Sequence, residues 1–315
     1  MVEGLARAVF VGSKRMGLRC LTAMHETHAS SLAGIITIDD RADTRHAFQE
    51  LHCFGEQNRI PVTVTRNGAE LHSAVRAAEP DLAIVCGWYS MIAPDTRAAA
   101  KRGFIGVHNS LLPRYRGAAP LVWAMLHGER EVGLSMYTLT SGMDDGDIWA
   151  QTTTTVGPDE YIGAVLGRLE DACAEMIRGT YPRIIGGAMT PIPQDASQAT
   201  YGTFRDREHG RIEWRESAEH IYRWIRAQSA PYPGAFTSCG GRRVTVWTAH
   251  PFPSPYYGRP GEVVRGASGE ALVVCGDERA LVIDEVQMED GGIVAGRDVL
   301  RPRTVLGNDE ITVDR

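Results

Sequence analysis

The sequence predicts a doubly wound α/β domain followed by a smaller β domain, and three features support this prediction. In the first 190 residues, apolar runs rich in Val and Ile alternate with stretches of helical periodicity. Strands that are apolar throughout are typical of a parallel sheet covered by helices on both faces. The composition then shifts to Pro, Gly, Thr and Gln, and afterwards to short alternating strands. A chain of 315 residues is long enough for two such domains.

The elements of the α/β domain follow one another in a regular order. The expected strands are residues 7–12, 32–38, 60–64, 81–86 and 103–108. The expected helices are residues 14–28, 44–58, 68–78 and 159–186. Alternation of this kind predicts βαβ units in a mostly parallel sheet, as in Rossmann-like domains.

The second domain is predicted to be a small OB-like β-barrel. After a helix at 216–228, Gly and Pro separate the expected strands, which are residues 234–239, 243–249, 261–265, 271–275 and 280–286. The predicted boundaries are 1–190 for the α/β domain, 191–210 for a linker and 211–315 for the β domain. The aromatic-rich segment 247–257 fits either an interface, such as that of a homodimer, or a packed barrel rim, and we favour the rim.

Charge and cysteine usage exclude several classes of function. The chain has 33 Lys plus Arg against 39 Asp plus Glu, a net charge of −6. Nucleic-acid binders usually show a basic excess, so no such partner is expected. The six cysteines form no CxxC pair, and no metal site is expected. Because there is no apolar run of membrane-span length and no signal-peptide pattern, we expect a cytoplasmic protein without a membrane partner.

Ligands in open α/β sheets bind at the carboxyl ends of the strands. The first predicted end turns directly into a helix, where free amides and the side chains of Ser13, Lys14 and Arg15 suit an anionic substrate group. A tight structural turn is the alternative interpretation.

A second strand end provides aromatic and aliphatic surface. Trp88, Met91 and Ile92 follow the strand at 81–86. Such side chains line pockets for flat heterocycles, but on spacing alone ordinary packing fits them equally well.

The third strand end carries a histidine. His108 closes the strand at 103–108, and the loop that follows contains Pro113 and Gly117. Further along the chain, Ser141 to Asp147 form an acidic loop with three aspartates. A carboxylate from this loop beside His108 would fix the tautomer of the imidazole. The alternative is a surface turn rich in aspartate.

Ordered motifs relate the chain to a known family. GVHNSLLPRYRGAAP at 106–120, followed by GMDDGD at 142–147, resembles the folate-dependent formyltransferases. That family includes methionyl-tRNA, glycinamide ribonucleotide and sugar N-formyltransferases. The sequences GRIEW, IRA and PYPGAF, between residues 210 and 236, resemble the barrel-like domain of its longer members.

The resemblance implies a reaction and a set of site residues. The donor would be 10-formyltetrahydrofolate and the acceptor an amine. His108 matches the histidine that stabilises the tetrahedral oxyanion and assists proton transfer, and Asp144 matches the aspartate that orients it. The residues expected near the folate are Trp88, Met91, Ile92, Leu139 and Asp144. The residues expected near the acceptor are Ser13, Lys14, Arg15, Asn109, Ser110 and Arg116.

One position departs from the family pattern. Gly106 stands where the family has an asparagine that donates a hydrogen bond to the oxyanion. Asn109 does not simply replace it, because in a strand positions 108 and 109 face opposite ways. Three interpretations stay open: a formyltransferase in which water or another side chain replaces the amide, a fold adapted to other one-carbon or acyl transfer, and a folate-binding protein with little catalysis.

The acceptor is expected to be the amine of a small molecule. Segment 39–46 is short, mixed in charge and free of lysine, whereas the corresponding region of methionyl-tRNA formyltransferases resembles a longer, lysine-rich loop. A tRNA acceptor, which needs many phosphate contacts, is therefore disfavoured. Lys14 and Arg15 suit a nucleotide-linked amino sugar, and the segment around Trp88 resembles the sugar N-formyltransferases. An amino-acid-like amine of secondary metabolism is the alternative.

Overall fold

The computed structural model of the protein describes residues 6–289 and 291–307. Contacts between residues divide the chain into two units. The first comprises the described part of Met1–Leu121 together with Glu131–Thr155 and Val165–Thr203. The second comprises Val122–Arg130, Val156–Ala164 and the described part of Phe204–Arg315. Two short segments from the middle of the sequence, Val122–Arg130 and Val156–Ala164, thus belong to the second unit.

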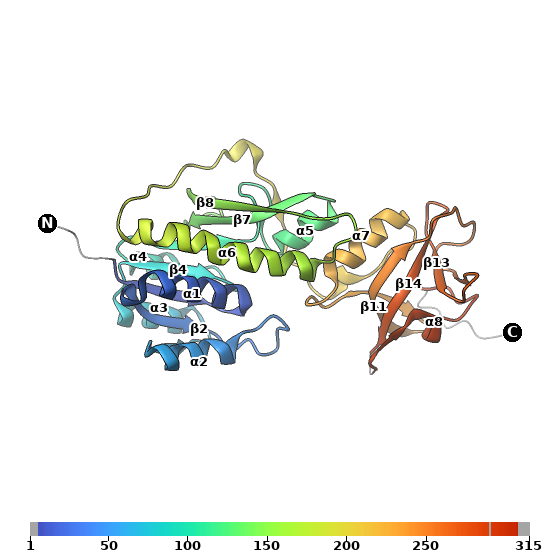
Figure 1. The fold of residues 1–315 in the computed structure, drawn as a ribbon, viewed down its shortest axis with the longest axis horizontal. Helices are drawn as coiled ribbons and strands as arrows, with labels where there is room; N and C mark the ends of the chain where they lie inside the picture. The colour runs from blue at the N-terminus through green and yellow to red at the C-terminus, as the bar shows by residue number, and fades with distance from the viewer. Residues whose placement is uncertain (1–5, 290, 308–315) are drawn as a thin grey trace. The chain divides into compact units, whose positions relative to one another are not determined.

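The first unit is built on a seven-stranded sheet in the order β3-β2-β1-β4-β5-β7-β8 (Figure 1). Its strands are β1 (Ala8–Gly12), β2 (Leu32–Thr37), β3 (Val62–Val64), β4 (Leu82–Cys86), β5 (Phe104–His108), β7 (Glu131–Thr138) and β8 (Ile148–Thr155). The first five strands of this order run parallel, and β7 and β8 are antiparallel to their neighbours. Because β1 and β4 are buried at every residue, they read as continuous apolar runs. The predicted α/β class is confirmed.

Helices cover both faces of this sheet. They are α1 (Lys14–His28), α2 (Phe48–Asn58), α3 (Gly68–Ala78), α4 (Pro94–Ala98) and α6 (Ile162–Ile185). A further helix, α5 (Pro120–Leu126), belongs to the second unit from Val122 onward. On one face α1 and α6 lie side by side, tied by ion pairs such as Arg178 to Glu26 at 2.7 Å (Figure 1). On the other face Leu71 and Val75 of α3 pack against Val9 and Val85. No helix within the described residues is long and apolar enough to cross a membrane.

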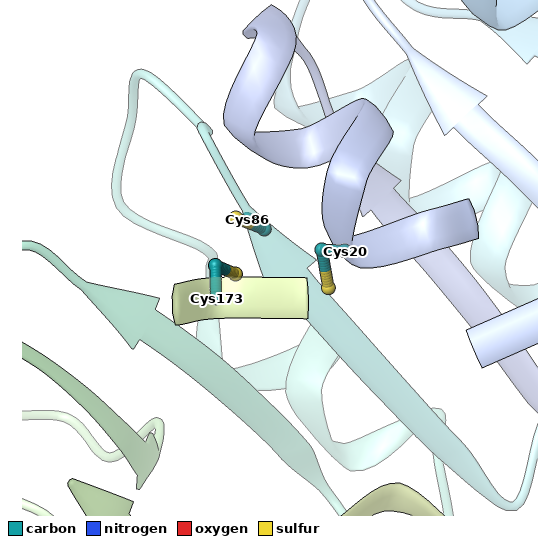
Figure 2. A group of neighbouring side chains, drawn as sticks. All are labelled: Cys20, Cys86 and Cys173. Atoms are coloured by element: carbon teal, nitrogen blue, oxygen red, sulfur yellow. The ribbon is translucent and has the colours of Figure 1, made fainter. Parts of the chain in front are cut away.

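Three thiols meet in the core of the face that carries α1 and α6. Figure 2 shows Cys20 of α1, Cys86 of β4 and Cys173 of α6 around one point, with their sulfur atoms within 4.8 Å of one another. Hydrogen bonding to Cys173 raises the pKa of the Cys20 and Cys86 thiols, and burial adds to this effect. Both groups therefore remain protonated thiols, and they pack as small apolar side chains.

The structure differs from the sequence prediction in a few elements. The helix expected at 44–58 begins only at Phe48, because residues 39–46 form a turned loop in which two arginines pair with nearby aspartates. The antiparallel strands β7 and β8 were not among the predicted elements. In β8, exposed and partly buried residues alternate along a run of threonines, so the strand shows no continuous apolar stretch.

The second unit contains an antiparallel sheet in the order β10-β11-β14-β13-β12, with β15 also paired to β14. Its elements are α7 (Ala218–Gln228), β10 (Ala235–Cys239), β11 (Arg242–Pro251), β12 (Val263–Arg265), β13 (Ala271–Val274), β14 (Ala280–Met288), β15 (Ile293–Ala295) and α8 (Gly296–Val299). The five strands predicted for this region are all present. The amphipathic α7 buries Ile221 and Ile225 among Val246 and Leu281 of the sheet, which gives the unit its own core.

The segment predicted as the start of a linker is part of the first unit up to Thr203. Ile192 forms a bridge with Ile148 of β8, and β9 (Tyr201–Gly202) pairs in parallel with β6 (Arg116–Gly117). Residues 191–203 therefore form a strap over the sheet edge beside the loop that follows His108.

Candidate active site

The candidate site is built at the carboxyl end of β5. His108 is the last residue of this strand and lies on the same face as Phe104 and Gly106, because side chains alternate along a strand. Phe104 belongs to the apolar cluster beneath α3. The histidine thus stands on rigid, buried backbone at the edge of the sheet where open α/β folds bind ligands.

Both ring nitrogens of His108 have a neighbour. The Nε2–H donates to the backbone carbonyl of Tyr115 at 2.9 Å, since a carbonyl oxygen can only accept. This bond fixes the ring so that Nδ1 faces Asp144, whose Oδ2 lies 3.7 Å away. Both side chains are mostly buried, with 11% and 18% of their surfaces exposed. The predicted pair is therefore brought together, with a carboxylate opposite the free nitrogen of the imidazole.

The carboxylate of Asp144 is held at both oxygens. Oδ2 accepts the backbone N–H of Gly117 at 2.7 Å, and Oδ1 accepts the hydroxyl of Tyr137 in a short hydrogen bond. Gly117 has φ +96°, and a Cβ there would lie 2.5 Å from the carbonyl oxygen of Gly202. Only glycine fits this close approach of two backbones, so the Gly117 N–H is available to Asp144 without a side chain in the way.

Gln194, on the strap, connects the acidic loop with the loop after His108. Its amide nitrogen donates to the carbonyl oxygens of Asp144 and Gly146 at 2.8 and 2.7 Å. Its amide oxygen accepts from Arg116 at 2.7 and 3.2 Å. Sequence reasoning did not identify Gln194, because it lies in a polar segment without periodicity. Its role follows only from the folded strap, which places its amide between the two loops.

Replacing Gln194 with Ala should loosen the acidic loop. The change leaves the mostly buried guanidinium of Arg116 without two hydrogen bonds, and uncompensated polar groups of this kind cost about 1–3 kcal/mol. Urea unfolding should show a loss of this size. Gln198→Ala is the matched control, because Gln198 is exposed and its side chain donates to the neighbouring Asp195; this variant should stay within about 0.5 kcal/mol of the wild type. Equal effects of the two variants would contradict the bridging role of Gln194.

The predicted residues of the loop after β5 serve mainly its own structure. Ser110 is buried, and its hydroxyl donates to the carbonyl of Arg114 at 2.6 Å. Arg116 is 5% exposed and also donates to the hydroxyl of Tyr201 at 3.3 Å. Asn109 is partly buried and makes no hydrogen bond with the described residues. Of these three side chains, Ser110 and Arg116 are engaged in hydrogen bonds within the described residues, whereas the amide of Asn109 is not.

The predicted anion site at the start of α1 is only partly assembled. Ser13 is fully buried, and its hydroxyl donates to Asp40 at 2.6 Å. Lys14 lies 4.0 Å from the ring centroid of Tyr89 and 3.9 Å from Asp43. Arg15 lies apart from these groups, 3.8 Å from Glu170 of α6, with 56% of its side chain exposed. Lys14 is the cation that remains at the strand end.

Burial, followed by the charge of Arg45, lowers the pKa of Lys14 to about 8, although Asp43 and Asp40 act in the opposite direction. Because the unfolded chain then binds more protons than the folded one between pH 8 and 10.5, this group adds stability as the pH rises through that window. Comparison of the wild type with Lys14→Met by urea unfolding across this range should show the increment in the wild type only.

The chain offers an internal reference for the same titration. It contains two lysines, and Lys101 is largely exposed with a single ion pair to Asp81. Pulse acetylation read by mass spectrometry should give a midpoint near pH 8 for Lys14. A Lys14 profile that coincides with that of Lys101 would contradict the buried environment.

The residues predicted around the flat heterocycle have unequal exposure. Ile92 is buried in the cluster beneath α3, and Trp88 and Leu139 pack against that cluster. Met91 is 69% exposed. The indole N–H of Trp88 is buried and has no hydrogen-bond partner among the described residues. Buried donors are rarely left unpaired. An acceptor atom of a ligand placed here would satisfy this N–H.

Gly106 is enclosed by side chains of the neighbouring strand and the residue that follows it. A Cβ at position 106 would lie 2.6 Å from Cδ1 of Leu139 and 3.0 Å from Cε1 of Tyr137. A contact of 2.6 Å is too short for a relaxed structure, and one of 3.0 Å requires the ring to move by a few tenths of an ångström. The two side chains therefore already occupy the space beside position 106.

Comparison with known proteins gives a consistent result for both units. The family model described as "Formyl transferase" matches residues 8–180, and the model described as "Formyl transferase, C-terminal domain" matches residues 205–303. The methionyl-tRNA formyltransferase of Halalkalibacterium halodurans is 32% identical over 301 residues, which cover 94% of each chain.

Solved structures agree in fold at lower sequence identity. The N-formyltransferase from Helicobacter canadensis, in complex with folinic acid and dTDP-3-aminofucose, has a TM-score of 0.65 at 14% identity and covers 90% of this chain and 100% of its own. HypX from Aquifex aeolicus in complex with tetrahydrofolic acid has a TM-score of 0.64 at 18% identity and covers 94% of this chain and 47% of its own. On the family matches and the full-length relatives, this chain belongs to the formyl transferase family and is a formyltransferase that uses 10-formyltetrahydrofolate.

Proposed function

We propose that this formyltransferase transfers the formyl group to the amine of a small molecule, with His108 and Asp144 as its catalytic pair. The observation that carries the catalytic part is the 3.7 Å approach of His108 Nδ1 to a carboxylate held at both oxygens. The donor supplies a formyl carbon that the amine nitrogen attacks, after which the bond from this carbon to N10 of the folate breaks. His108 is the residue that we assign to stabilising the oxyanion on that carbon. Asp144 keeps the imidazole oriented and accepts the proton that the amine loses. This proton passes on to N10 as the carbon–N10 bond breaks, so that tetrahydrofolate leaves as a neutral amine.

The surroundings of the strand end fit a folate. The unpaired indole N–H of Trp88 offers a hydrogen bond, and Leu139 offers apolar surface beside it. We assign Trp88, Met91 and Leu139 to the donor side of the site. Ile92 is buried behind them and supports Trp88 through packing.

The loop after β2 argues against a large polyanionic acceptor. Arg41 donates two hydrogen bonds to Asp39 at 2.8 and 2.6 Å, and Arg45 donates two to Asp43 at 2.9 and 2.7 Å. Arginines engaged with carboxylates in this way have no net charge to offer to phosphates. The chain has 33 Lys plus Arg against 39 Asp plus Glu, a net charge of −6, so its composition shows no basic excess of the kind typical of nucleic-acid binders. Lys14 remains to receive one anionic group of a small acceptor.

Methionyl-tRNA is the second candidate acceptor. It is favoured by two relatives that match over 94% and 90% of the chain, because both are methionyl-tRNA formyltransferases. One assay separates the two candidates. The protein is incubated with 10-formyltetrahydrofolate and either charged initiator tRNA or a panel of nucleotide-linked amino sugars and diamino acids, and formylated products are identified by mass spectrometry.

Formylation of a small amine with turnover, and none of methionyl-tRNA, is the expected result. Formylation of methionyl-tRNA alone would overturn the proposed acceptor class while keeping the catalytic pair. Calorimetric titration with 5-formyltetrahydrofolate tests the donor side separately, and it should show micromolar binding that Trp88→Phe weakens.

A further inference from the structure

We propose that Gly106 and Tyr137 form a matched pair, in which Tyr137 is a positioning residue that holds Asp144 and Gly106 provides the space for its ring. This inference rests on the proposed function, in which Asp144 works with His108. It assigns a role to the two residues at which this site departs most from simple expectation: a glycine at a position where an asparagine was expected, and a buried phenol beside a carboxylate.

The strand register places the two residues together. Gly106 of β5 lies directly opposite Tyr137 of the antiparallel β7, and residues opposite each other in a sheet project from the same face. The Tyr137 ring also lies edge-on to the ring of His108, with 6.2 Å between centroids. The phenol therefore occupies the surface next to His108 that a side chain at position 106 would otherwise cover.

The space beside position 106 is already filled. A Cβ there would lie 2.6 Å from Cδ1 of Leu139, the end of a flexible side chain that can turn away, and 3.0 Å from the ring of Tyr137, whose hydroxyl is bonded to Asp144. An asparagine side chain extends further and would displace the ring. The hydroxyl of Tyr137 would then lose its contact with Asp144.

The hydroxyl of Tyr137 stays protonated and is therefore a constant hydrogen-bond donor. Tyr137 is 8% exposed, and burial, followed by the charge of Asp144, raises the pKa of the phenol. The hydroxyl donates to Oδ1 of Asp144, while Gly117 N–H and His108 face Oδ2. With one donor on each oxygen, the carboxylate cannot rotate away from His108, and this restraint is the function we assign to Tyr137.

The test starts with Tyr137→Phe, which removes the hydroxyl and keeps the ring. A hydrogen bond to a charged group corresponds to roughly 10–100-fold in rate when it acts in the transition state. We expect kcat to fall by this factor and KM for the amine to change less than about threefold. The pH profile of kcat should also change, because the carboxylate that faces His108 loses a fixed donor. Tyr181→Phe is the matched control: Tyr181 is also buried and bonds to Ser31 at 2.6 Å, so its replacement should affect stability without altering the pH profile.

The space requirement is tested without any activity. Gly106→Ala should lower the melting temperature in the wild type and have a much smaller effect in Tyr137→Met, because a flexible side chain can move out of the way. In the activity assay, Gly106→Asn should reduce kcat about 100-fold, and the double variant Gly106→Asn with Tyr137→Met should recover at least tenfold over it.

Different results would overturn the spatial pairing, the positioning role and the proposed function. Additive effects of Gly106→Ala and Tyr137→Met on the melting temperature would overturn the spatial pairing. A Tyr137→Phe variant with wild-type kcat and pH profile would overturn the positioning role. If the wild type formylates no acceptor, the proposed function fails, and the coupling in melting temperature still decides whether the two residues form a pair.

Discussion

Asp144→Asn should lower kcat for formyl transfer by about 10²–10⁴, the range typical of a lost general base. The variant keeps the shape of the side chain but loses its charge beside His108 Nδ1. It also replaces one of two acceptor oxygens by a donor, although both oxygens face donors, Gly117 N–H and Tyr137 O–H. An amide therefore cannot satisfy both contacts in either orientation.

Asp145 provides the matched control for this variant. It is adjacent in the same acidic loop, is exposed, and bonds to the hydroxyl of Thr140. Asp145→Asn should retain kcat within about threefold, since surface changes away from special features are usually small. His108→Gln should lose as much kcat as Asp144→Asn. The double variant should be little worse than either single one, because residues that act as a unit are not additive. A kcat above one tenth of the wild type in Asp144→Asn would contradict the assignment.

Gly117→Ala should cause the second large loss of kcat, because it strains the backbone rather than removing a charge. The residue has φ +96°, and the new Cβ would lie 2.5 Å from the carbonyl oxygen of Gly202. Either the backbone of the strap moves or the strain is kept, at a cost of about 1–3 kcal/mol in unfolding free energy. Because Gly117 N–H holds Asp144, we expect kcat to fall about 10²-fold, the scale attributed to a 1 Å misplacement of a catalytic group.

Gly103→Ala separates strain from the effect on the site. Gly103 has φ +78°, and an added Cβ would meet nothing within 4 Å. It should cost about 1–2 kcal/mol for the left-handed conformation and leave kcat unchanged within about twofold. Steady-state kinetics and urea unfolding on both variants check this. A Gly117→Ala enzyme with normal kcat would show that its N–H does not position Asp144.

The sequence identified the parts of the fold that depend on local patterns. Apolar runs located the five parallel strands, and the motif residues led to His108 and Asp144, which the fold brings within 3.7 Å. The antiparallel strand β8 was missed because half of its residues are threonines, which are partly buried or exposed, and no apolar run marks it.

The supporting residues of the site depend on long-range packing. Tyr137 meets Gly106 only through the register between β5 and β7, and that register has no local signature. Gln194 reaches Asp144 and Arg116 across 50 and 78 positions of sequence separation. A departure at Gly106 was visible in the sequence, but the side chains that fill its space were not.

A single-turnover experiment with a formyl-labelled donor shows whether Asp144 is required for transfer of the formyl group to the amine. Wild type and Asp144→Asn are mixed in excess over labelled 10-formyltetrahydrofolate in the presence of the accepted small amine, and the label is traced by mass spectrometry. The wild type should place the label on the amine, whereas Asp144→Asn should bind the donor but leave the label on the folate. Label on the amine at equal rates in both proteins, or release of free formate by the wild type, would contradict the proposed function.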